Sequence, residues 1–376
     1  MTKGGLEDVV AANSAIADII GPQGKLTYRG IDIHDLARHS SFEETTYLLW
    51  FGSLPTREAL AEFSAELASH RALPPQVLTL MKDFPRNAAP MDALRTALSA
   101  LAFYDPQARD SSRDANVAKA MRVTAQTATI VGAYEQIRRG RQPIEPEEAG
   151  SHAESFLRML FGAEPDPLYA RATDLALILH ADHELNASTF AARVTAATLA
   201  DMYSAVVSAI GALAGPLHGG ANEQVMKMLQ KIGEPARVEA YVTERLEAHQ
   251  KISGFGHRVY RTEDPRATHL REMSRQLGEH VGNLRWYEIS RKVEEVVMQQ
   301  KHLYANVDFY SASCYFTMGI PIDMFTPVFA VSRISGWTAH ILEQYADNRL
   351  IRPRAEYVGL KDVPYLPIDR RVRAAS

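Results

Sequence analysis

One histidine lies between glycines and just before three arginines in the segment GFGHRVYRTEDPRA, residues 254–267. Gly254 and Gly256 let backbone N–H groups approach a ligand closely, because glycine has no side chain. His257 can change protonation near neutral pH. Permanent positive charge comes from Arg258, Arg261 and Arg266. The combination indicates an anion-binding site with acid–base chemistry, although a basic surface loop has the same composition.

A second segment, HADHELNAST at residues 180–189, places His180 and His183 three residues apart. The two share one helical face if the helix persists. A metal pair is one interpretation, but no HExxH pattern follows, so contact with an anion is favoured. Side chains that cap and turn fill residues 186–189, which predicts that the helix ends there and directs polar groups toward a cleft.

His218 stands in PLHGGANE, directly before two glycines and a predicted helix. A helix N-terminus lowers the pKa of a nearby imidazole. A neutral imidazole at this place can donate a hydrogen bond to an oxyanion that develops during a reaction. A histidine that merely caps the helix is the alternative.

Asp308 lies between two apolar residues in NVDFYSA, residues 306–312. If it is buried, its carboxylate is unusually basic, as abstraction of a carbon-bound proton requires. A surface-turn aspartate is the alternative. Lys301, seven residues earlier, could reach a phosphate or simply be solvated.

Arg333 is embedded in the apolar segment FTPVFAVSRISGWTAHILEQ, residues 325–344. A buried arginine needs a carboxylate partner, either from the protein or from a ligand. Arg352 and Arg354 follow in NRLIRPRAEY, so a ligand is credible, with a helix-end salt bridge as the alternative for that last pair.

Most of the chain has helical periodicity, which predicts an all-α fold. Residues 14–33 are the exception, because they alternate apolar and polar side chains around glycines and predict one or two short hairpins. Residues 191–211 are small and apolar on nearly all sides and predict a central buried helix. The other predicted helices are residues 45–50, 56–70, 91–102, 116–138, 151–161, 167–180, 222–231, 235–249, 267–277, 286–299 and 326–343.

Two glycine-rich breaks, at residues 215–220 and 319–321, divide the chain. They predict a large domain of residues 1–218 and 321–376 and a smaller domain of residues 219–320. An insert hinged on glycines can close over a ligand.

The composition indicates an ordinary globular protein of 376 residues, with 46% hydrophobic residues and a net charge of −4. That charge argues against general nucleic-acid binding. Cys314 is the single cysteine, so neither an intrachain disulfide nor a cysteine zinc site is expected. No signal peptide or membrane-spanning run is recognised, and a cytoplasmic location without membrane partners is predicted.

Six of these segments occur in the order and roughly the spacing found in the citrate synthase family, which the chain resembles. They are HADHELNAST, PLHGGANE, GFGHRVYRTEDPRA, NVDFYSA, FTPVFAVSRISGW and RPRAEY. The resemblance covers most of the chain and is to the short bacterial and archaeal type. It implies a nearly all-α fold in which a small mobile domain closes over oxaloacetate and creates the coenzyme A site.

The resemblance also implies catalytic roles. Asp308 would remove a proton from the methyl carbon of acetyl-CoA, His218 would donate a hydrogen bond to the thioester oxygen, and His257 would polarise the ketone of oxaloacetate. The resulting citryl-CoA would be hydrolysed to citrate and CoA. No metal or redox cofactor is implied, and acetyl-CoA is a cosubstrate.

Binding residues follow from the same motifs. Three side chains would hold the oxaloacetate carboxylates: His183, Arg266 and Arg333. Arg352 would reach the same ligand from the second subunit of a homodimer. Arg261 and Lys301 match positions that hold coenzyme A phosphates. Arg258 is either a further coenzyme A contact or a structural partner of nearby carboxylates, and no role is assigned to it.

Two other functions remain open at this stage. A 2-methylcitrate synthase uses propionyl-CoA with the same motifs, and one methyl group is worth only about 1–3 kcal/mol in a pocket. A non-catalytic binding protein of the same fold is the more remote alternative, since such a relic is expected to lose one of His218, His257 and Asp308.

Overall fold

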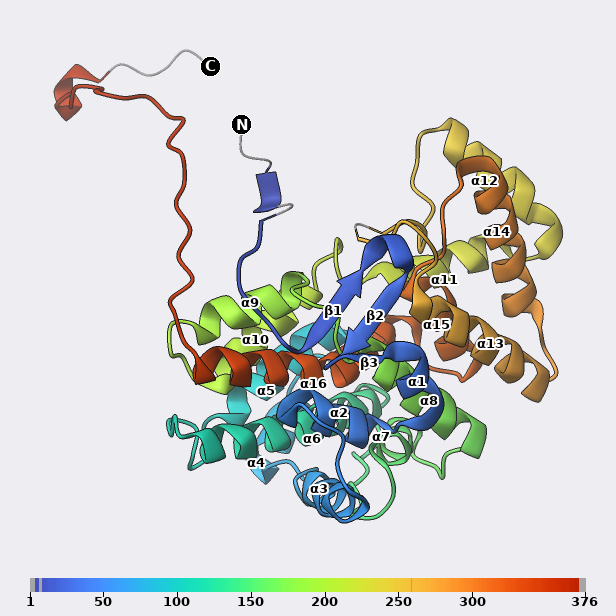
Figure 1. Ribbon diagram of the computed structural model, residues 1–376, viewed down its shortest axis with the longest axis horizontal. Helices are drawn as coiled ribbons and strands as arrows, with labels where there is room; N and C mark the ends of the chain where they lie inside the picture. Colours follow the sequence, from blue (N-terminus) through green and yellow to red (C-terminus); the bar gives the residue numbers. More distant parts are fainter. Residues whose placement is uncertain (1–3, 7–8, 258, 372–376) are drawn as a thin grey trace.

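The computed structural model describes residues 4–6, 9–257 and 259–371, and this part of the chain is almost entirely helical (Figure 1). Its α-helices are α1 (Ile33–His39), α2 (Phe42–Phe51), α3 (Arg57–Ser69), α4 (Pro75–Lys82), α5 (Pro90–Leu101), α6 (Arg113–Arg138), α7 (His152–Phe161), α8 (Pro167–His180), α9 (Ala187–Ala196), α10 (Met202–Leu213), α11 (Ala221–Ile232), α12 (Val238–Glu247), α13 (Pro265–His280), α14 (Arg285–Lys301), α15 (Val307–Thr317) and α16 (Phe325–Ala346). Short 3-10 helices are η1 (Gly4–Leu6), η2 (Gly21–Gln23), η3 (Pro235–Arg237), η4 (Ile322–Met324) and η5 (Ile368–Arg370). The predicted all-α class is confirmed.

A small antiparallel sheet near the N-terminus is the other regular element. Strands β1 (Ala17–Ile20), β2 (Lys25–Tyr28) and β3 (Ile31–Asp32) pair in that order. Ala17 faces Tyr28 and Ile20 faces Lys25 across the first hairpin. The prediction of one or two short hairpins is therefore confirmed, with two present.

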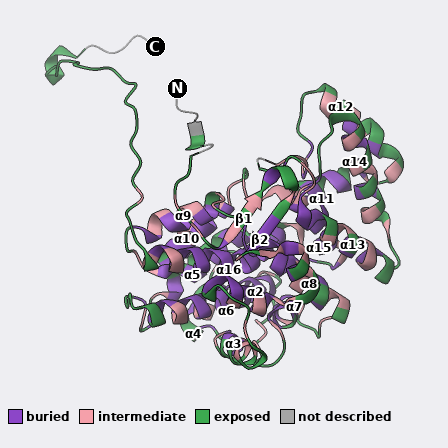
Figure 2. Cartoon of the chain, in the orientation of Figure 1, coloured by how far each residue is buried: buried purple, intermediate pink, exposed green. Residues whose placement is uncertain are grey.

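Helix α16 forms the centre of the core. Every residue from Met324 to Ile341 is buried, and the helix packs against α2, α5, α6, α8, α9 and α10 (Figure 2). An all-round apolar sequence produces such a buried helix. Arg333 is thus carried deep inside the molecule.

Helices α11 to α15 gather on one side of the molecule (Figure 1). Within this group α15 packs against α11 and α13, and α14 packs against α12 and α13. Contacts to the remaining helices run through α1, α8 and α16. The division into a large domain and a small domain of residues 219–320 remains a prediction, as does the movement of one against the other.

The prediction of one helix over residues 191–211 is wrong. The segment is divided between α9 and α10, because Leu199 adopts a left-handed backbone with φ of 63° and Asp201 caps the second helix by accepting a hydrogen bond from Ser204 N–H. The two helices still pack closely against each other. The small side chains therefore allow two helices joined by a turn to pack closely against each other.

Both ends of the described chain leave the helical body. After α16 the chain runs outward as an extended, exposed segment, and residues 9–15 leave from the same side (Figures 1 and 2). We call residues 347–371 the C-terminal arm. In the part of the chain that is described, no helix combines the length and apolar character needed to span a bilayer.

Candidate active site

Six of the nine predicted site residues line one cleft of about 730 Å³: His183, His218, His257, Arg266, Asp308 and Arg333. They come from the turn after α8, the turn before α11, the 254–266 segment, α15 and α16. The fold therefore brings together side chains that are up to 150 residues apart in sequence.

Asp308 lies in the first turn of α15, where its backbone N–H is capped by Asn306 Oδ1 at 3.1 Å. Its Oδ1 atom is buried and has no hydrogen-bond partner among the described residues. Burial, reinforced by the nearby Asp264 carboxylate, raises the pKa of Asp308 to about 6 against the opposing effects of Arg266 and Arg333. The side chain is a partly desolvated base, and the surface-turn alternative does not hold.

The loop that carries His257 is tied to the start of α15. Gly256 N–H donates to Tyr304 O at 3.0 Å, and Asn306 N–H donates to Gly254 O at 2.9 Å. Gly254 has φ of 81°, and a Cβ there would lie 2.8 Å from the Phe309 ring, so glycine is required. The Gly256 N–H is already used by Tyr304 O, and the approach of other backbone N–H groups of this loop to a ligand remains a prediction.

The His257 ring is held as a single neutral tautomer. Its Nδ1 accepts hydrogen bonds from Val259 N–H at 3.0 Å and from Tyr260 N–H at 3.2 Å, so the proton resides on Nε2. Burial, together with the charge of Arg266, lowers the pKa of His257 to about 4. His257 therefore offers an N–H donor at neutral pH.

His218 is a second neutral donor, positioned by Ser188. The Ser188 N–H donates to His218 Nε2 at 3.3 Å, and the Ser188 hydroxyl lies 2.8 Å from the same nitrogen. The proton is thereby assigned to Nδ1. Burial, together with Arg333, lowers the pKa of His218 to about 4. These causes, rather than the predicted helix terminus, account for the neutral ring.

Arg266 is buried and pairs with Asp264. Its Nε and Nη2 donate to the two Asp264 oxygens at 2.9 and 2.7 Å. The Nη1 group does not bond to this carboxylate, and we call it the free edge of Arg266. Asp264 also caps α13 and accepts the Val307 N–H at 3.2 Å. Asp264 therefore joins the starts of α13 and α15 on either side of the cleft.

Arg333 is a buried cation without a carboxylate partner. Its Nε donates to His180 O at 2.6 Å, and its guanidinium lies 4.7 Å from the centroid of the Phe329 ring. Among the described residues, no carboxylate oxygen lies within 4 Å of its nitrogens. Burial lowers the pKa of Arg333 to about 10. Because an uncompensated buried charge is costly, this geometry favours an anionic ligand.

His183 completes the anion-binding group. Its Nε2 lies 3.2 Å from the Tyr260 hydroxyl, and its ring centroid lies 5.1 Å from that of His257. Burial and the neighbouring charge of Arg266 hold the pKa of His183 well below its usual range. A neutral His183 can contribute a hydrogen bond to a carboxylate.

His180 and His183 do not share a helical face, because α8 ends at His180. The His180 ring is buried and its Nδ1 lies 2.8 Å from Ala176 O. The described ranges contain no group of three or more His, Cys, Asp or Glu side chains that could hold a metal ion. The absence of a metal cofactor remains a prediction.

Arg261 and Lys301 are exposed and lie outside the cleft. Arg261 lines a hollow of about 240 Å³ and Lys301 lines another of about 560 Å³, and both hollows share Gly256 and His257 with the cleft. The two cations thus flank the loop that carries His257.

Arg352 does not reach the cleft of its own chain. It is exposed on the C-terminal arm and lines a hollow of about 890 Å³ between residues 9–15 and the end of α16. Neither Arg352 nor Arg354 forms an ion pair with a described residue, so the alternative of a helix-end salt bridge is not observed. Arg258 lies outside the described residues.

Three residues of the site were not assigned from the sequence: Ser188, Tyr260 and Asp264. Asp264 could have been found, because Asp-Pro-Arg has the form of a capping residue followed by a helix-starting proline. The contacts of Ser188 and Tyr260 join segments 30 and 77 residues apart, and no local pattern reveals them.

A family model described as the C-terminal domain of citrate synthase matches residues 5–354. Citrate synthase 2 of Bacillus subtilis is 52% identical over 98% of this chain and 98% of its own. Citrate synthase of Haloferax volcanii is 51% identical over 98% and 99%, and 2-methylcitrate synthase of Shewanella oneidensis is 40% identical over 99% and 98%.

Solved structures give the same result. The crystal structure of citrate synthase from Pyrobaculum aerophilum superposes with a TM-score of 0.92 at 41% identity, covering 98% of this chain and 95% of that one. A second solved structure is the ternary complex of Thermoplasma acidophilum citrate synthase with carboxymethyl coenzyme A and oxaloacetate. It superposes with a TM-score of 0.92 at 34% identity, covering 98% of both chains.

Proposed function

Since the chain belongs to the citrate synthase family, we propose that its cleft condenses acetyl-CoA with oxaloacetate and hydrolyses the product to citrate and CoA. The observation that carries this proposal is the meeting of an unpartnered basic carboxylate with two neutral imidazole donors in one cleft. A carbon acid can be deprotonated there while the developing enolate oxygen receives a hydrogen bond.

The first step makes the nucleophile. Asp308 takes a proton from the methyl carbon of acetyl-CoA, and the Nδ1–H of His218 donates to the thioester oxygen as it becomes an enolate. The raised pKa of Asp308 makes its carboxylate a stronger base than an ordinary aspartate. Both side chains are half-buried, which limits the access of the water that would otherwise weaken this interaction.

The second step forms the carbon–carbon bond. The Nε2–H of His257 donates to the ketone oxygen of oxaloacetate, which makes the ketone carbon more electrophilic. The enolate carbon attacks it and the ketone oxygen takes up a proton, giving citryl-CoA. Water then cleaves the thioester to a carboxylate and the CoA thiol, and the loss of the thioester drives the reaction forward.

Oxaloacetate is a dianion, and the cleft offers matching donors. His183, Arg333 and the free edge of Arg266 hold its carboxylates, which supplies both affinity and orientation. Arg261 and Lys301 hold coenzyme A phosphates on the far side of the His257 loop. No metal or redox cofactor takes part in this scheme.

The function is tested by measuring CoA release with oxaloacetate, comparing kcat/KM for acetyl-CoA and propionyl-CoA. Acetyl-CoA is expected to be preferred, by roughly 10-fold or more, which is the discrimination that one methyl group allows. Omission of oxaloacetate controls for simple thioester hydrolysis. A preference for propionyl-CoA would reassign the enzyme to 2-methylcitrate synthesis, and no release with either thioester would contradict the condensation.

A homodimer is part of the proposal. Arg352 is remote from its own cleft, and the C-terminal arm exposes large apolar side chains including Val358, Leu360 and Tyr365. Exposed apolar surface of this kind is typical of a protein–protein contact. We assign the arm to a second copy of the chain, whose cleft receives Arg352.

Mixed dimers test this assignment. Asp308→Asn and Arg352→Ala homodimers are each expected to be nearly inactive, whereas exchange of their subunits creates one intact site per heterodimer. Statistical exchange should therefore restore roughly a quarter of wild-type activity per site. Unmixed variants treated identically are the control. Verified heterodimers without recovered activity would show that Arg352 serves its own chain.

The domain division is proposed on the same basis. Residues 219–320 would move as the small domain against residues 1–218 and 321–376, closing over oxaloacetate. The cytoplasmic location also stays a prediction.

A further inference from the structure

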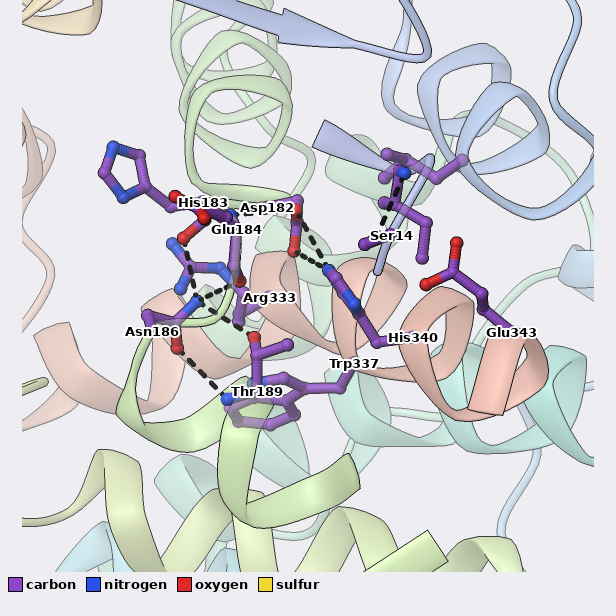
Figure 3. A network of polar contacts seen from close by, with 12 residues as sticks. Ser14, Asp182, His183, Glu184, Asn186, Thr189, Arg333, Trp337, His340 and Glu343 are labelled. Atoms are coloured by element: carbon purple, nitrogen blue, oxygen red, sulfur yellow. Dashed lines mark hydrogen bonds and ion pairs between the residues drawn. The ribbon is translucent and has the colours of Figure 1, made fainter. Parts of the chain in front are cut away.

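A buried Asp–His pair lies directly behind the cleft and takes no part in the proposed chemistry. Arg333 and His340 of helix α16 point toward the turn that follows α8 (Figure 3), and Gly336 lies between them in the sequence of the helix. A Cβ at Gly336 would lie 2.2 Å from Ala181 O and 2.6 Å from Asp182 Oδ1. Glycine at this position therefore allows the turn to sit against the helix and brings Asp182 beside His340.

The hydrogen bonds fix the state of the pair. His340 Nε2 lies 3.3 Å from each carboxylate oxygen of Asp182, and both side chains are fully buried. Arg193 Nη1 lies 3.2 Å from His340 Nδ1. Arginine can only donate, so Nδ1 accepts and the proton on Nε2 points at Asp182 (Figure 3). We call these residues the Asp182–His340–Arg193 unit.

At the Asp182 end, the unit is hydrogen-bonded to a turn with a left-handed residue. Asp182 Oδ2 accepts the Glu184 N–H at 3.2 Å, and Glu184 has a left-handed backbone with φ of 52°. A non-glycine residue adopts this conformation only where the surrounding structure enforces it. The same turn carries His183 into the cleft and leads to Ser188, the partner of His218.

The outer end of the unit is hydrogen-bonded to the end of α16 and, through it, to the N-terminal segment. Arg193 donates to Glu343 Oε2 at 2.6 Å and to Gln344 Oε1 at 3.0 Å. Glu343 Oε1 in turn accepts the Ala15 N–H at 2.8 Å. His340 is therefore held from behind at the end of α16, and it does not line the cleft.

We propose that Asp182 and His340, fixed by Arg193, are positioning residues that hold the 182–188 turn so that His183 and Ser188 are correctly placed for oxaloacetate and for His218. The pair touches no reacting atom. The statement that oxaloacetate is the affected ligand rests on the proposed function. The effect of the pair on dicarboxylate binding can be measured without turnover.

The test compares three variants with the wild type. His340→Phe removes both polar contacts, whereas His340→Gln keeps an N–H for Asp182 and an oxygen for Arg193. His152→Phe is the matched control, because His152 is equally buried, stacks on Phe42, and has no hydrogen-bond partner for either ring nitrogen among the described residues. It lies on α7 and does not line the cleft.

His340→Phe is expected to raise the Kd and KM for oxaloacetate and to lower kcat, each by about 10- to 100-fold, since small misplacement of binding groups has such effects. The KM for acetyl-CoA, measured at saturating oxaloacetate, should stay within about twofold. His340→Gln should recover most of the loss, and His152→Phe should show none. Equal effects of the two phenylalanine variants, or no rescue by glutamine, would overturn the proposal.

Asp182→Asn provides a second route if His340→Phe does not fold, because it preserves side-chain volume. The same rise in KM for oxaloacetate is expected, and unchanged oxaloacetate kinetics would contradict the proposal. Binding of oxaloacetate, measured by calorimetry, tests the positioning role separately from the proposed reaction. Failure of wild-type turnover with intact binding would reject the proposed reaction, while a weakened Kd in His340→Phe would still support the positioning role.

Discussion

Replacement of Asp308 by asparagine is expected to lower kcat by about 1,000-fold, while KM for oxaloacetate changes little. A positioned general base contributes about 10²- to 10⁴-fold, and the amide has the same shape but cannot accept the proton. In the wild type, Asp308 must be ionised to act, so kcat should rise with pH through about 6. Steady-state kinetics from pH 5 to 8 measures both effects.

The same variant should be more stable than the wild type at pH 8. A carboxyl whose pKa is higher in the folded state destabilises that state when ionised, and a shift of about two units corresponds to on the order of 1–2 kcal/mol after allowance for solvent access. Below about pH 4 the carboxyl is protonated in both the folded and the unfolded state, so the wild type is not destabilised. The destabilisation grows as the pH rises from about 4 to 6. Urea unfolding at pH 5 and 8 tests the sign.

Asp83→Asn is the control for this prediction, because Asp83 is exposed at the end of α4 and remote from the cleft. It should leave kcat unchanged. If Asp308→Asn retained kcat within tenfold, another group would have to be the base. If it gained no stability at pH 8, ionisation of Asp308 would not destabilise the folded state.

Replacement of Arg333 by methionine is expected to raise the KM for oxaloacetate by about 100-fold or more. Charge-assisted hydrogen bonds to a carboxylate are worth about 1.5–3 kcal/mol, and the loss of bidentate geometry adds to this. The free protein should not lose stability in proportion, because the variant also removes a buried cation that lacks a carboxylate partner in the described structure. The rise in Tm produced by oxaloacetate should largely disappear.

Arg71→Met supplies the matched control. Arg71 is equally buried but donates to the backbone carbonyls of Glu147, Ala149 and Gly150, far from the cleft. Its loss should reduce stability and leave the oxaloacetate-dependent rise in Tm intact. An Arg333→Met enzyme with an unchanged rise would show that this cation does not bind the dicarboxylate.

Much of the helical fold could be predicted where the ends of helices are marked by local chemistry. The range 167–180 agrees with α8 at both ends, because Asp166 caps a helix that begins with proline. Thr56 likewise caps α3 as predicted. The break at residues 197–201 was missed because Ala, Thr and Leu give no stop signal there, and the left-handed turn at Leu199 depends on how α9 and α10 pack.

The candidate site, like the fold, could be predicted only in part from the sequence. Six residues of the cleft could be named from residue type and motif, because each motif carries its own chemistry. What could not be predicted is how these groups are held. The choice of tautomer at His218 depends on Ser188, and the free edge of Arg266 depends on Asp264, and both follow from tertiary contacts. The short helices α1 and α4 were also missed.

The cations proposed to bind the two substrates differ in their exposure to solvent. Arg266 and Arg333 are buried, whereas Arg261 and Lys301 are exposed. Dissolved ions screen exposed charges over a Debye length of about 8 Å at physiological ionic strength, but they penetrate a buried site poorly. Rising salt should therefore weaken the capture of acyl-CoA well before that of oxaloacetate. Under the proposed assignment, recognition of the oxo acid would be insulated from the ionic composition of the medium, and recognition of the coenzyme would not.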